Sequence, residues 1–337
     1  MRTLVVSDFH LGARLGHDVL RHPEPQRRLL AALDGIDRLV LLGDIVELME
    51  GRQQRALAIA EPVLRAIGER LGPERRVLVV PGNHDSPLVR PWVRALGPDL
   101  QTSTVVPLDA TRTLARVTGW LTPASVEVRY PGAWLSERVW ATHGHYLDRH
   151  LMPVSGYGIA RGLLRRRPAT PATPLDYELS RRPSSARFAG HLPLPVAELL
   201  NDFAELVRAA TMPRIRRGLL SPRLAPVTAS VLGMQMRRAS MPALARMVAR
   251  LGIDADWVVF GHVHRLGPLA DDEPTFWAGA DGRPRLANCG SWLYEPLLVN
   301  RAVAPHPYWP GGALLIEDDG DPRAIGLLDG VPADELR

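Results

Sequence analysis

The sequence predicts an α/β fold, and two features of the chain support this prediction. Up to residue 104, apolar runs of strand length alternate with segments of helix length, which is the βαβαβα order of a parallel sheet with right-handed crossovers. From Val105 onward the segments are shorter and alternate in polarity, which is typical of antiparallel strands. With 337 residues, 46% of them hydrophobic, the chain can bury a full core, as one large domain or as a domain of about 240 residues with an insertion.

The first part of the chain supplies the elements of a parallel sheet. Its strands are almost continuously apolar, as expected of strands that are covered on both faces, and they are predicted over residues 1–8, 38–43 and 76–81. Helices are predicted over residues 25–33, 55–71 and 87–96. In the longest of these, Val63, Ile67 and Leu71 recur at helical spacing and Gly72-Pro73 ends the helix.

In the second part of the chain, short segments from Val105 onward resemble antiparallel strands, and those of the C-terminal tail are expected to complete a second sheet. A helix over residues 241–251 leads into a strand over 257–261. The remaining strand-like segments are short and lie on both sides of this pair, over residues 113–120, 125–130, 137–143, 276–279, 284–290, 292–299, 312–318 and 324–328.

Residues 147–240 differ from the rest of the chain in composition. All 41 basic residues of the protein are Arg, and residues 147–250 hold 17 of them against only 6 Asp plus Glu. We interpret residues 147–240 as an Arg-rich helical insertion or cap, with a helix over 196–210, and residues 1–146 and 241–337 as one domain. A basic segment suits an anionic partner such as phosphate, nucleic acid or an acidic membrane surface. The alternative is a solvated basic surface on a structural insertion.

Cysteine content and hydropathy exclude several classes of protein. The single cysteine, Cys289, excludes a disulfide framework and a Cys-rich zinc site. The sequence begins directly with a predicted strand and contains no apolar run of the roughly 18–20 residues that span a bilayer. We therefore expect a cytoplasmic protein.

Five apolar runs each end in side chains that bind metal ions or transfer protons. Because the carboxyl ends of such strands meet at one edge of an α/β sheet, we expect these side chains to lie together. Each motif alone is also explained as an ordinary turn, but the ordered recurrence of all five favours a site. The motifs are Asp8 with His10, Asp44, Asn83-His84-Asp85, His143 with His145, and His262 with His264.

The chemistry of this set indicates a transition-metal centre. Carboxylate and amide oxygens together with imidazole nitrogens suit Mn, Fe, Zn or Co better than Ca, and the lack of Cys ligands argues against structural zinc. Two neighbouring divalent ions need a bridging carboxylate, and at about 3.5–4 Å apart they clamp a phosphoryl group and a water.

In their order and spacing, D8-F-H10, G43-D44, G82-N83-H84-D85, H143-G144-H145 and G261-H262-V263-H264 resemble the full signature of the calcineurin-like metallophosphoesterases. The motifs span residues 8 to 264, every position matches, and N288-C289-G290-S291 is similar to the family's closing segment. The resemblance implies a four-layer αββα sandwich, here with a basic helical cap insertion.

The resemblance also implies roles for individual residues. Two divalent ions are expected, Mn first, with Fe, Zn or Co as alternatives. A hydroxide bridging them would attack phosphorus in line. His84 would protonate the leaving oxygen or steady the transition-state charge, and Asp85 would orient its imidazole. The implied metal ligands are Asp8, His10 and His264 for one ion, Asn83, His143 and His262 for the other, and Asp44 for both.

Residues beside the motifs are candidates for substrate contacts. His145 follows His143 at a spacing of two and is expected to face substrate or to be a solvated loop residue. Tyr146 lies just before the inserted segment and is a candidate for the pocket wall. Glu47 follows Asp44 and is expected either to support the metal site or to begin the next helix as an N-terminal carboxylate. His17 has no motif context and is expected at the surface.

Within the family, the segments GDIVELMEG and THGHYLDRH and the basic insertion are most similar to the UDP-2,3-diacylglucosamine pyrophosphohydrolases of lipid A synthesis. Those enzymes commonly have Arg at the position of His84 and a shorter lid. The similarity implies hydrolysis of a phosphodiester or pyrophosphate bond in a phosphorylated small-molecule, nucleotide-linked or lipid-linked substrate. The Arg-rich cap would grip a diphosphate or contact an anionic membrane at its inner face.

Two further functions remain as alternatives. A phosphomonoesterase resembling the Ser/Thr protein phosphatases fits the metal ligands. A non-catalytic scaffold on the same fold, as in the retromer subunit, would lack motif residues, and here all are present. Nucleic acid is not expected as a partner because no recognition motif or interleaving of basic and aromatic residues occurs.

Overall fold

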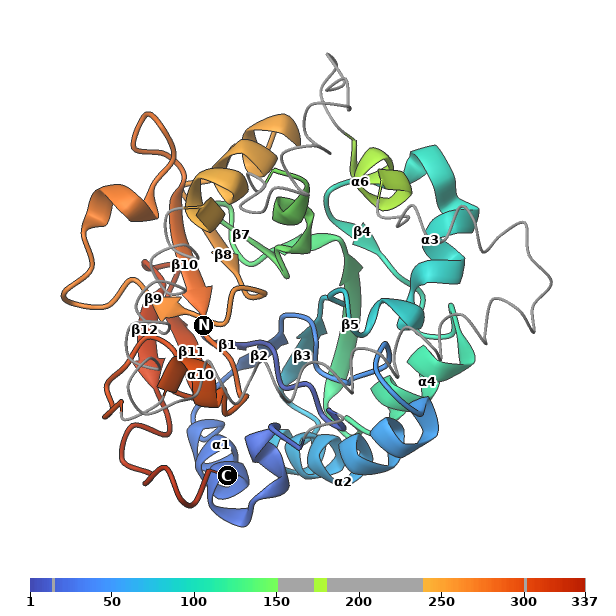
Figure 1. Cartoon of the computed structure of the whole chain (residues 1–337). Helices are drawn as coiled ribbons and strands as arrows, with labels where there is room; N and C mark the ends of the chain where they lie inside the picture. The colour runs from blue at the N-terminus through green and yellow to red at the C-terminus, as the bar shows by residue number, and fades with distance from the viewer. Residues whose placement is uncertain (14–15, 151–172, 181–238, 300–301, 337) are drawn as a thin grey trace, which may run out of the picture.

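The computed structural model describes residues 1–336 except 14–15, 151–172, 181–238 and 300–301. It contains a seven-stranded sheet in the order β12-β11-β1-β2-β3-β5-β4 and a five-stranded sheet in the order β6-β7-β8-β10-β9 (Figure 1). Both sheets are mixed, with parallel strands at their centres. None of the described helices is long and apolar enough to cross a membrane.

The first sheet is built on four parallel strands from the first half of the chain, each pairing in register with the next. They are β1 (Arg2–Val6), β2 (Arg38–Leu41), β3 (Arg76–Val79) and β5 (Ser125–Tyr130). Antiparallel strands flank them, namely β4 (Thr104–Val105) beside β5, β11 (Gly312–Glu317) beside β1, and β12 (Arg323–Gly326) beside β11.

The second sheet draws its strands from both sides of the predicted insertion. At its centre, β7 (Val139–Thr142), β8 (Trp257–Phe260) and β10 (Arg285–Cys289) run parallel. The antiparallel strands β6 (Gly132–Trp134) and β9 (Leu266–Gly267) form its edges.

The helices lie between the strands in sequence, and the longer ones pack on the sheets. The described α-helices include α1 (Pro23–Ala32), α2 (Gln53–Leu71), α3 (Arg90–Leu96), α4 (Arg112–Gly119), α6 (Pro174–Ser180) and α10 (Pro296–Val299). Residues 239–250 are also helical. The 3-10 turns are η1 (Val19–Arg21), η2 (Ser86–Leu88), η3 (Gly97–Asp99), η4 (His145–Arg149) and η5 (Pro274–Trp277).

Three hydrophobic clusters define four layers. Alternate side chains of a strand point to opposite faces, so on β1 Leu4 packs with the cluster under α1, α2 and α4, whereas Val5 packs between the two sheets. On the far side, Val258 and Phe260 of β8 pack with Leu244 in the helix over residues 239–250. Helices therefore cover the outer face of each sheet (Figure 1), and the predicted αββα sandwich is confirmed.

Two groups of predicted strands were wrong. Residues 113–120 lie largely in α4, because the Thr111 side chain accepts a hydrogen bond from the Leu114 backbone amide as an N-cap, and Leu114, Val117 and Thr118 form one buried helical face. In the tail, 276–279 and 292–299 are not strands, and half of each lies in η5 and α10, respectively. The segments 312–318 and 324–328 do form strands, β11 and β12, but they join the first sheet beside β1.

Most of the predicted cap, including the helix over residues 196–210, lies outside the described residues, and the division into a domain and an insertion stays a prediction. Its described helix, α6, packs against the core beside η4. Tyr177 is buried, stacks on Tyr146 at 4.7 Å between ring centroids, and its hydroxyl lies 2.8 Å from His150 Nε2. Glu178 accepts hydrogen bonds from the hydroxyls of Tyr130 and Tyr146.

The packing of α2 on the turn after α4 makes a testable prediction at Gly68. An added Cβ there would lie 2.4 Å from the Leu121 carbonyl oxygen. Although alanine is normally the better helix residue by about 1 kcal/mol, we expect Gly68→Ala to lower the free energy of unfolding by about 1–3 kcal/mol because of this overlap. The matched control is Gly119→Ala in α4, where no atom lies within 4 Å. Equal urea midpoints for Gly68→Ala and the control would contradict the contact.

Candidate metal centre

The predicted motif residues all follow the carboxyl ends of parallel strands. Asp8 follows β1, Asp44 follows β2 and Asn83 follows β3, whereas His143 and His262 follow β7 and β8 of the other sheet. The two sheets thus bring their strand ends to one shared edge, where α/β proteins bind ligands.

Five of the candidate ligands have left-handed backbone conformations. Their φ angles are 56° for Asp8, 45° for His10, 54° for Asp44, 69° for His262 and 57° for His264. Positive φ is uncommon outside glycine, with Asp and His among the more tolerant residues. The conformation turns the chain sharply just after each strand, so that consecutive polar side chains face the same point.

Motif glycines allow the loops to approach one another. A Cβ on Gly82 would lie 2.3 Å from Asp44 Oδ1, and a Cβ on Gly261 would lie 2.5 Å from Asp8 Oδ2. Asn288, near the end of β10, is a supporting residue that lies in the N288-C289-G290-S291 segment and outside the five motifs. Its side-chain amide donates to the Gly261 carbonyl oxygen at 2.6 Å and so holds the loop that carries His262 and His264.

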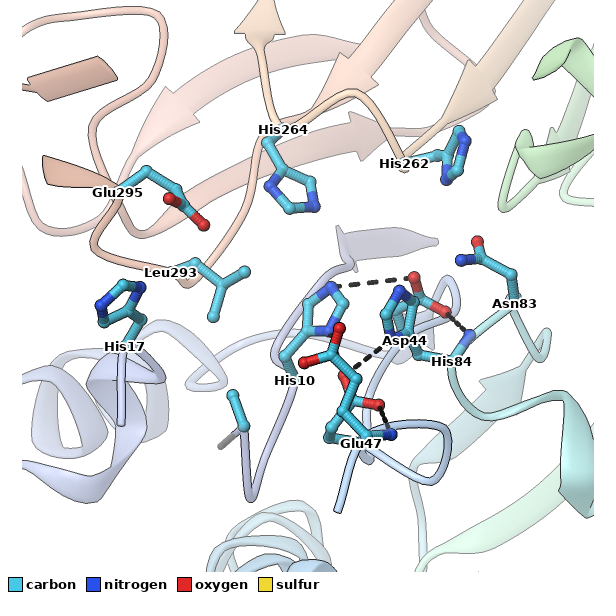
Figure 2. Close-up of a pocket in the computed structure, with 12 residues that line it drawn as sticks. His10, His17, Asp44, Glu47, Asn83, His84, His262, His264, Leu293 and Glu295 are labelled. Atoms are coloured by element: carbon cyan, nitrogen blue, oxygen red, sulfur yellow. Dashed lines mark hydrogen bonds and ion pairs between the residues drawn. The ribbon is translucent and has the colours of Figure 1, made fainter. Parts of the chain in front are cut away.

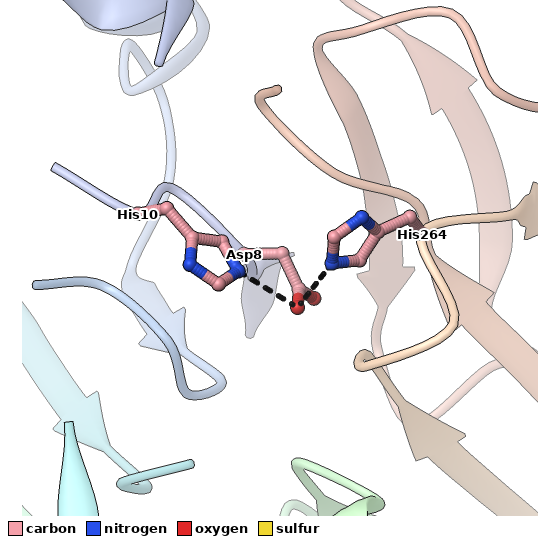
Figure 3. A group of neighbouring side chains, drawn as sticks. All are labelled: Asp8, His10 and His264. Atoms are coloured by element: carbon pink, nitrogen blue, oxygen red, sulfur yellow. Dashed lines mark ion pairs between the residues drawn. The ribbon is translucent and has the colours of Figure 1, made fainter. Parts of the chain in front are cut away.

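The first group of candidate ligands consists of Asp8, His10 and His264 (Figure 3). Asp8 Oδ2 accepts a hydrogen bond of 3.0 Å from the His262 backbone amide. Its other oxygen, Oδ1, lies 3.3 Å from His264 Nε2 and 3.9 Å from His10 Nε2. The backbone therefore fixes the carboxylate, and its second oxygen faces two imidazoles.

The second group consists of Asp44, His143 and His262. Asp44 repeats the pattern of Asp8, since its Oδ1 accepts a 2.7 Å hydrogen bond from the His84 backbone amide. Asp44 Oδ2 lies 3.1 Å from His143 Nε2 and 3.7 Å from His10 Nε2, so it stands between the two groups. The Asn83 side-chain oxygen lies 3.1 Å from His143 Nε2.

The donor atoms fit divalent cations. Within each group the ligand atoms lie within 4.8 Å of one another. Among the described residues, the buried atoms Asp8 Oδ1 and His10 Nε2 have no hydrogen-bond partner. Buried polar atoms are normally satisfied. Convergent, unsatisfied carboxylate and imidazole atoms of this kind suit Mn, Fe, Zn or Co.

Partners on the far side of the rings orient the candidate ligands. His143 Nδ1 lies 3.0 Å from the Leu42 carbonyl oxygen and His10 Nδ1 lies 3.0 Å from Glu47 Oε2. In both residues Nε2 is the atom that faces the cluster. His262 also has a side-chain partner, since its Nε2 lies 2.9 Å from Asp148 Oδ1. Metal-binding histidines in general have such partners, which fix the orientation of the ring.

The charges in the cluster shift the pKa values of its groups in opposite directions. Burial alone would raise the pKa of Asp8, but the neighbouring His143 and His264 lower it to about 2. Burial likewise opposes the shift at His143, where the charges of Asp44 and Asp8 raise the pKa to about 10. The pKa of His264 is also raised: burial opposes this shift, the charge and close approach of Asp8 outweigh it, and Glu295 adds to it. The cluster thus attracts positive charge strongly.

Glu47 joins His10 to His84. Its Oε2 lies 3.0 Å from His10 Nδ1 and 2.7 Å from His84 Nδ1, the latter as a close ion pair without the alignment of a hydrogen bond. Its Oε1 accepts hydrogen bonds from the backbone amides of Met49 and Glu50. Despite burial, the two imidazoles lower the pKa of Glu47 to about 2, and Glu47 in turn helps to raise that of His84 to about 9. Because α2 begins only at Gln53, Glu47 is not the helix-starting carboxylate of the alternative prediction.

The expected contact between Asp85 and the His84 imidazole is not formed. The Asp85 carboxylate is buried and accepts hydrogen bonds from the backbone amides of Ile45, at 2.9 Å, and Gly82. Burial and the nearby charge of Asp44 raise its pKa to about 6. Asp85 therefore ties the second motif to the third, and Glu47 takes the place beside His84.

A cavity of about 410 Å³ opens over these groups (Figure 2). Besides candidate ligands, it is lined by His84, Glu47 and Glu50, and by His17, Leu293 and Glu295. His17 was predicted to lie at the surface, and Glu295 was not among the predicted site residues. Neither belongs to a motif, so the sequence offers no signal for them. They reach the site through a pairing between loops that are far apart in the chain.

His145 and Tyr146 lie beside the centre but are not among the residues that line this cavity. Both are buried, and the His145 ring lies 5.5 Å from that of His143 and 4.8 Å from that of Tyr146 between centroids. The Tyr130 hydroxyl lies 3.5 Å from His145 Nε2. Their contact with substrate stays a prediction.

An αββα sandwich with Asp, Asn and His at its strand ends is the architecture of a metal-dependent hydrolase. The family model for calcineurin-like phosphoesterases matches residues 1–266. The chain belongs to this calcineurin-like phosphoesterase family, and it is therefore a metal-dependent phosphoester hydrolase.

Solved structures resemble the chain only distantly. The cold-active protein-tyrosine phosphatase of a psychrophilic Shewanella species is 16% identical, with a TM-score of 0.33, over 98% of this chain and 78% of that one. A mutant cold-active protein tyrosine phosphatase is 15% identical, with the same TM-score and coverage. The comparison with curated proteins gave no match.

Proposed function

We propose that the protein is a dinuclear-metal phosphoesterase in which Asp44 bridges the two ions. The observation that carries this proposal is the position of Asp44 Oδ2, 3.1 Å from His143 Nε2 and 3.7 Å from His10 Nε2. One ion would take its ligands from the first group, Asp8, His10 and His264. The other would take Asn83, His143 and His262. Manganese is the first candidate, with Fe, Zn or Co as alternatives.

When bound, two such ions would polarise the phosphoryl oxygens and lower the pKa of a water. The protein's own residues place the ester and handle the leaving group. His84 lines the cavity and its Nδ1 faces Glu47, so its Nε2 is available to give a proton to the departing oxygen. Asp85 contributes by fixing the loops of Asp44 and Asn83 through backbone hydrogen bonds.

The charge of the cavity favours a diester over a monoester. Glu47, Glu50 and Glu295 line it, and no Arg does so in the described part of the chain. A phosphomonoester carries a second negative charge near neutral pH, whereas a diester carries one. We therefore propose a phosphodiester or diphosphate bond as the target, with a nucleotide-linked or lipid-linked molecule as substrate. The predicted contact between the Arg-rich segment and a diphosphate or an anionic membrane concerns residues outside the described ones.

The test is a comparison of substrates with metal-reconstituted protein. We expect Mn-dependent hydrolysis of bis-p-nitrophenyl phosphate to exceed that of p-nitrophenyl phosphate in kcat/KM by at least tenfold, and a nucleotide-diphosphate sugar to be cleaved as well. A preference for the monoester would identify a phosphatase instead. If no metal supported turnover and mass spectrometry found no bound metal, the chain would be a scaffold on this fold.

A further inference from the structure

The wall of the cavity that lies away from Asn83 carries a carboxylate that forms no hydrogen bond or ion pair with another described side chain. His17, Leu293 and Glu295 form this wall (Figure 2), and Glu295 points its carboxylate into the cavity. Among the described residues, no hydrogen bond or ion pair holds the Glu295 side chain. None of the five motifs accounts for it, and it is not among the candidate metal ligands.

The wall is held rigidly by backbone pairing. The Tyr294 amide donates a hydrogen bond of 2.8 Å to the His17 carbonyl oxygen, and the Val19 amide donates one of 3.1 Å to the Trp292 carbonyl oxygen. Between them, Asp18 and Leu293 form an antiparallel bridge. Trp292 is fully buried and anchors the pair, because its indole donates to the Gly312 carbonyl oxygen at 3.2 Å. A side chain presented from such a base has a defined position, as binding sites require.

The chemistry of the wall limits what it can bind. An ionised carboxylate only accepts hydrogen bonds, so its complement is a hydroxyl or ammonium group, and it repels a further phosphate. Leu293 beside it offers an apolar contact for a carbon skeleton. The whole cavity, at about 410 Å³, falls in the range that holds small organic ligands.

We propose that this wall is the subsite for the organic group of the substrate, and that Glu295 accepts hydrogen bonds from hydroxyl groups on it. The preferred substrates are then phosphodiesters of polyols, such as a ribose or another sugar. This inference rests on the proposed function, since it assigns the group that is esterified to the phosphorus bound at the metal centre.

The test uses two substrates that differ only in their hydroxyl groups, the p-nitrophenyl ester of uridine 5′-monophosphate and its 2′,3′-dideoxy counterpart. A hydrogen bond to a charged acceptor corresponds to about a tenfold or larger effect on binding. We expect wild type to favour the diol by at least about tenfold in kcat/KM. In Glu295→Ala this preference should vanish, because the diol ester loses more in kcat/KM than the dideoxy ester does. Glu295→Gln, which keeps an acceptor oxygen, should be intermediate, and the exposed Glu69→Ala on α2 serves as the control.

Binding without turnover gives a second measurement. Calorimetry should show uridine 5′-monophosphate binding more tightly than its dideoxy analogue to wild type, and equally to Glu295→Ala. Equal use of both esters by wild type, or an equal loss on both in Glu295→Ala, would overturn the subsite. A loss confined to p-nitrophenyl phosphorylcholine would show a cation site and also overturn it. If wild type cleaves no ester with any metal, the proposed function fails, and the calorimetric comparison still decides the subsite.

Discussion

Replacing Asp44 by Asn is expected to lower kcat/KM for bis-p-nitrophenyl phosphate by about 1,000-fold or more, because a bridging carboxylate compensates the repulsion between two cations. The substitution keeps the shape of the side chain, and Asn tolerates the φ of 54° at this position. Asn Oδ1 also retains an acceptor for the His84 amide. The change therefore removes charge and leaves the local fold intact.

Metal content distinguishes loss of the centre from loss of the fold. Inductively coupled plasma mass spectrometry should find about two ions per chain in wild type and at most about one in Asp44→Asn. Asp99→Asn, an exposed carboxylate outside the site, should keep both the metal and the activity. Full activity in Asp44→Asn with an unchanged metal content would rule out the bridging role.

The second large effect is expected at Glu47, which contacts both His10 and His84. Glu47→Gln introduces a neutral side chain of the same shape, and so removes the negative charge that holds the imidazoles of His10 and His84. Losing such a partner of a metal ligand typically costs about 10–100-fold in metal affinity or activity, and we expect a loss in kcat/KM of at least this size.

Glu50→Gln is the matched control for Glu47→Gln. Glu50 lines the same cavity and its charge contributes to the raised pKa of His84, but among the described residues its side chain forms no hydrogen bond or ion pair with His10 or His84. Manganese titration should show weaker metal binding in Glu47→Gln and near-normal binding in Glu50→Gln. Equal effects of the two substitutions would mean that the net negative charge of the cavity matters and that the specific contacts of Glu47 do not.

The sequence predicted the positions that carry chemistry better than it predicted their partners. Asp8, Asp44 and His143 each follow an apolar run, and the rule that strand ends meet at a sheet edge is enough to bring them together. Partners such as Glu47 for His84 depend on side-chain direction within loops. Asp85 is next to His84 in sequence and was therefore expected to contact the His84 imidazole. In the structure Glu47 makes that contact, and Asp85 accepts a backbone hydrogen bond instead.

The errors in the fold prediction have the same origin. Residues 113–120 alternate in polarity as a strand does, but the Thr111 cap and the burial of Leu114 and Val117 make them a helix. Strands β11 and β12 have the right pattern, yet nothing local specifies which sheet they join. The pairing of the loops around residues 17 and 294, which brings Glu295 to the cavity, is likewise a product of tertiary structure.

The left-handed backbone at Asp8, His10, Asp44, His262 and His264 has a consequence for evolution. Each such residue disfavours the folded chain by about 1–2 kcal/mol relative to glycine. Selection for turnover would retain this backbone strain, because glycine has no side chain with which to bind a metal ion. In a gene copy released from that selection, glycine at these five sites would relieve the backbone strain, although at Asp8 and Asp44 it would also remove the acceptors of two backbone amides. In a pseudoenzyme descended from this chain, substitutions would therefore be expected first at these candidate metal ligands and only later in the surrounding sandwich.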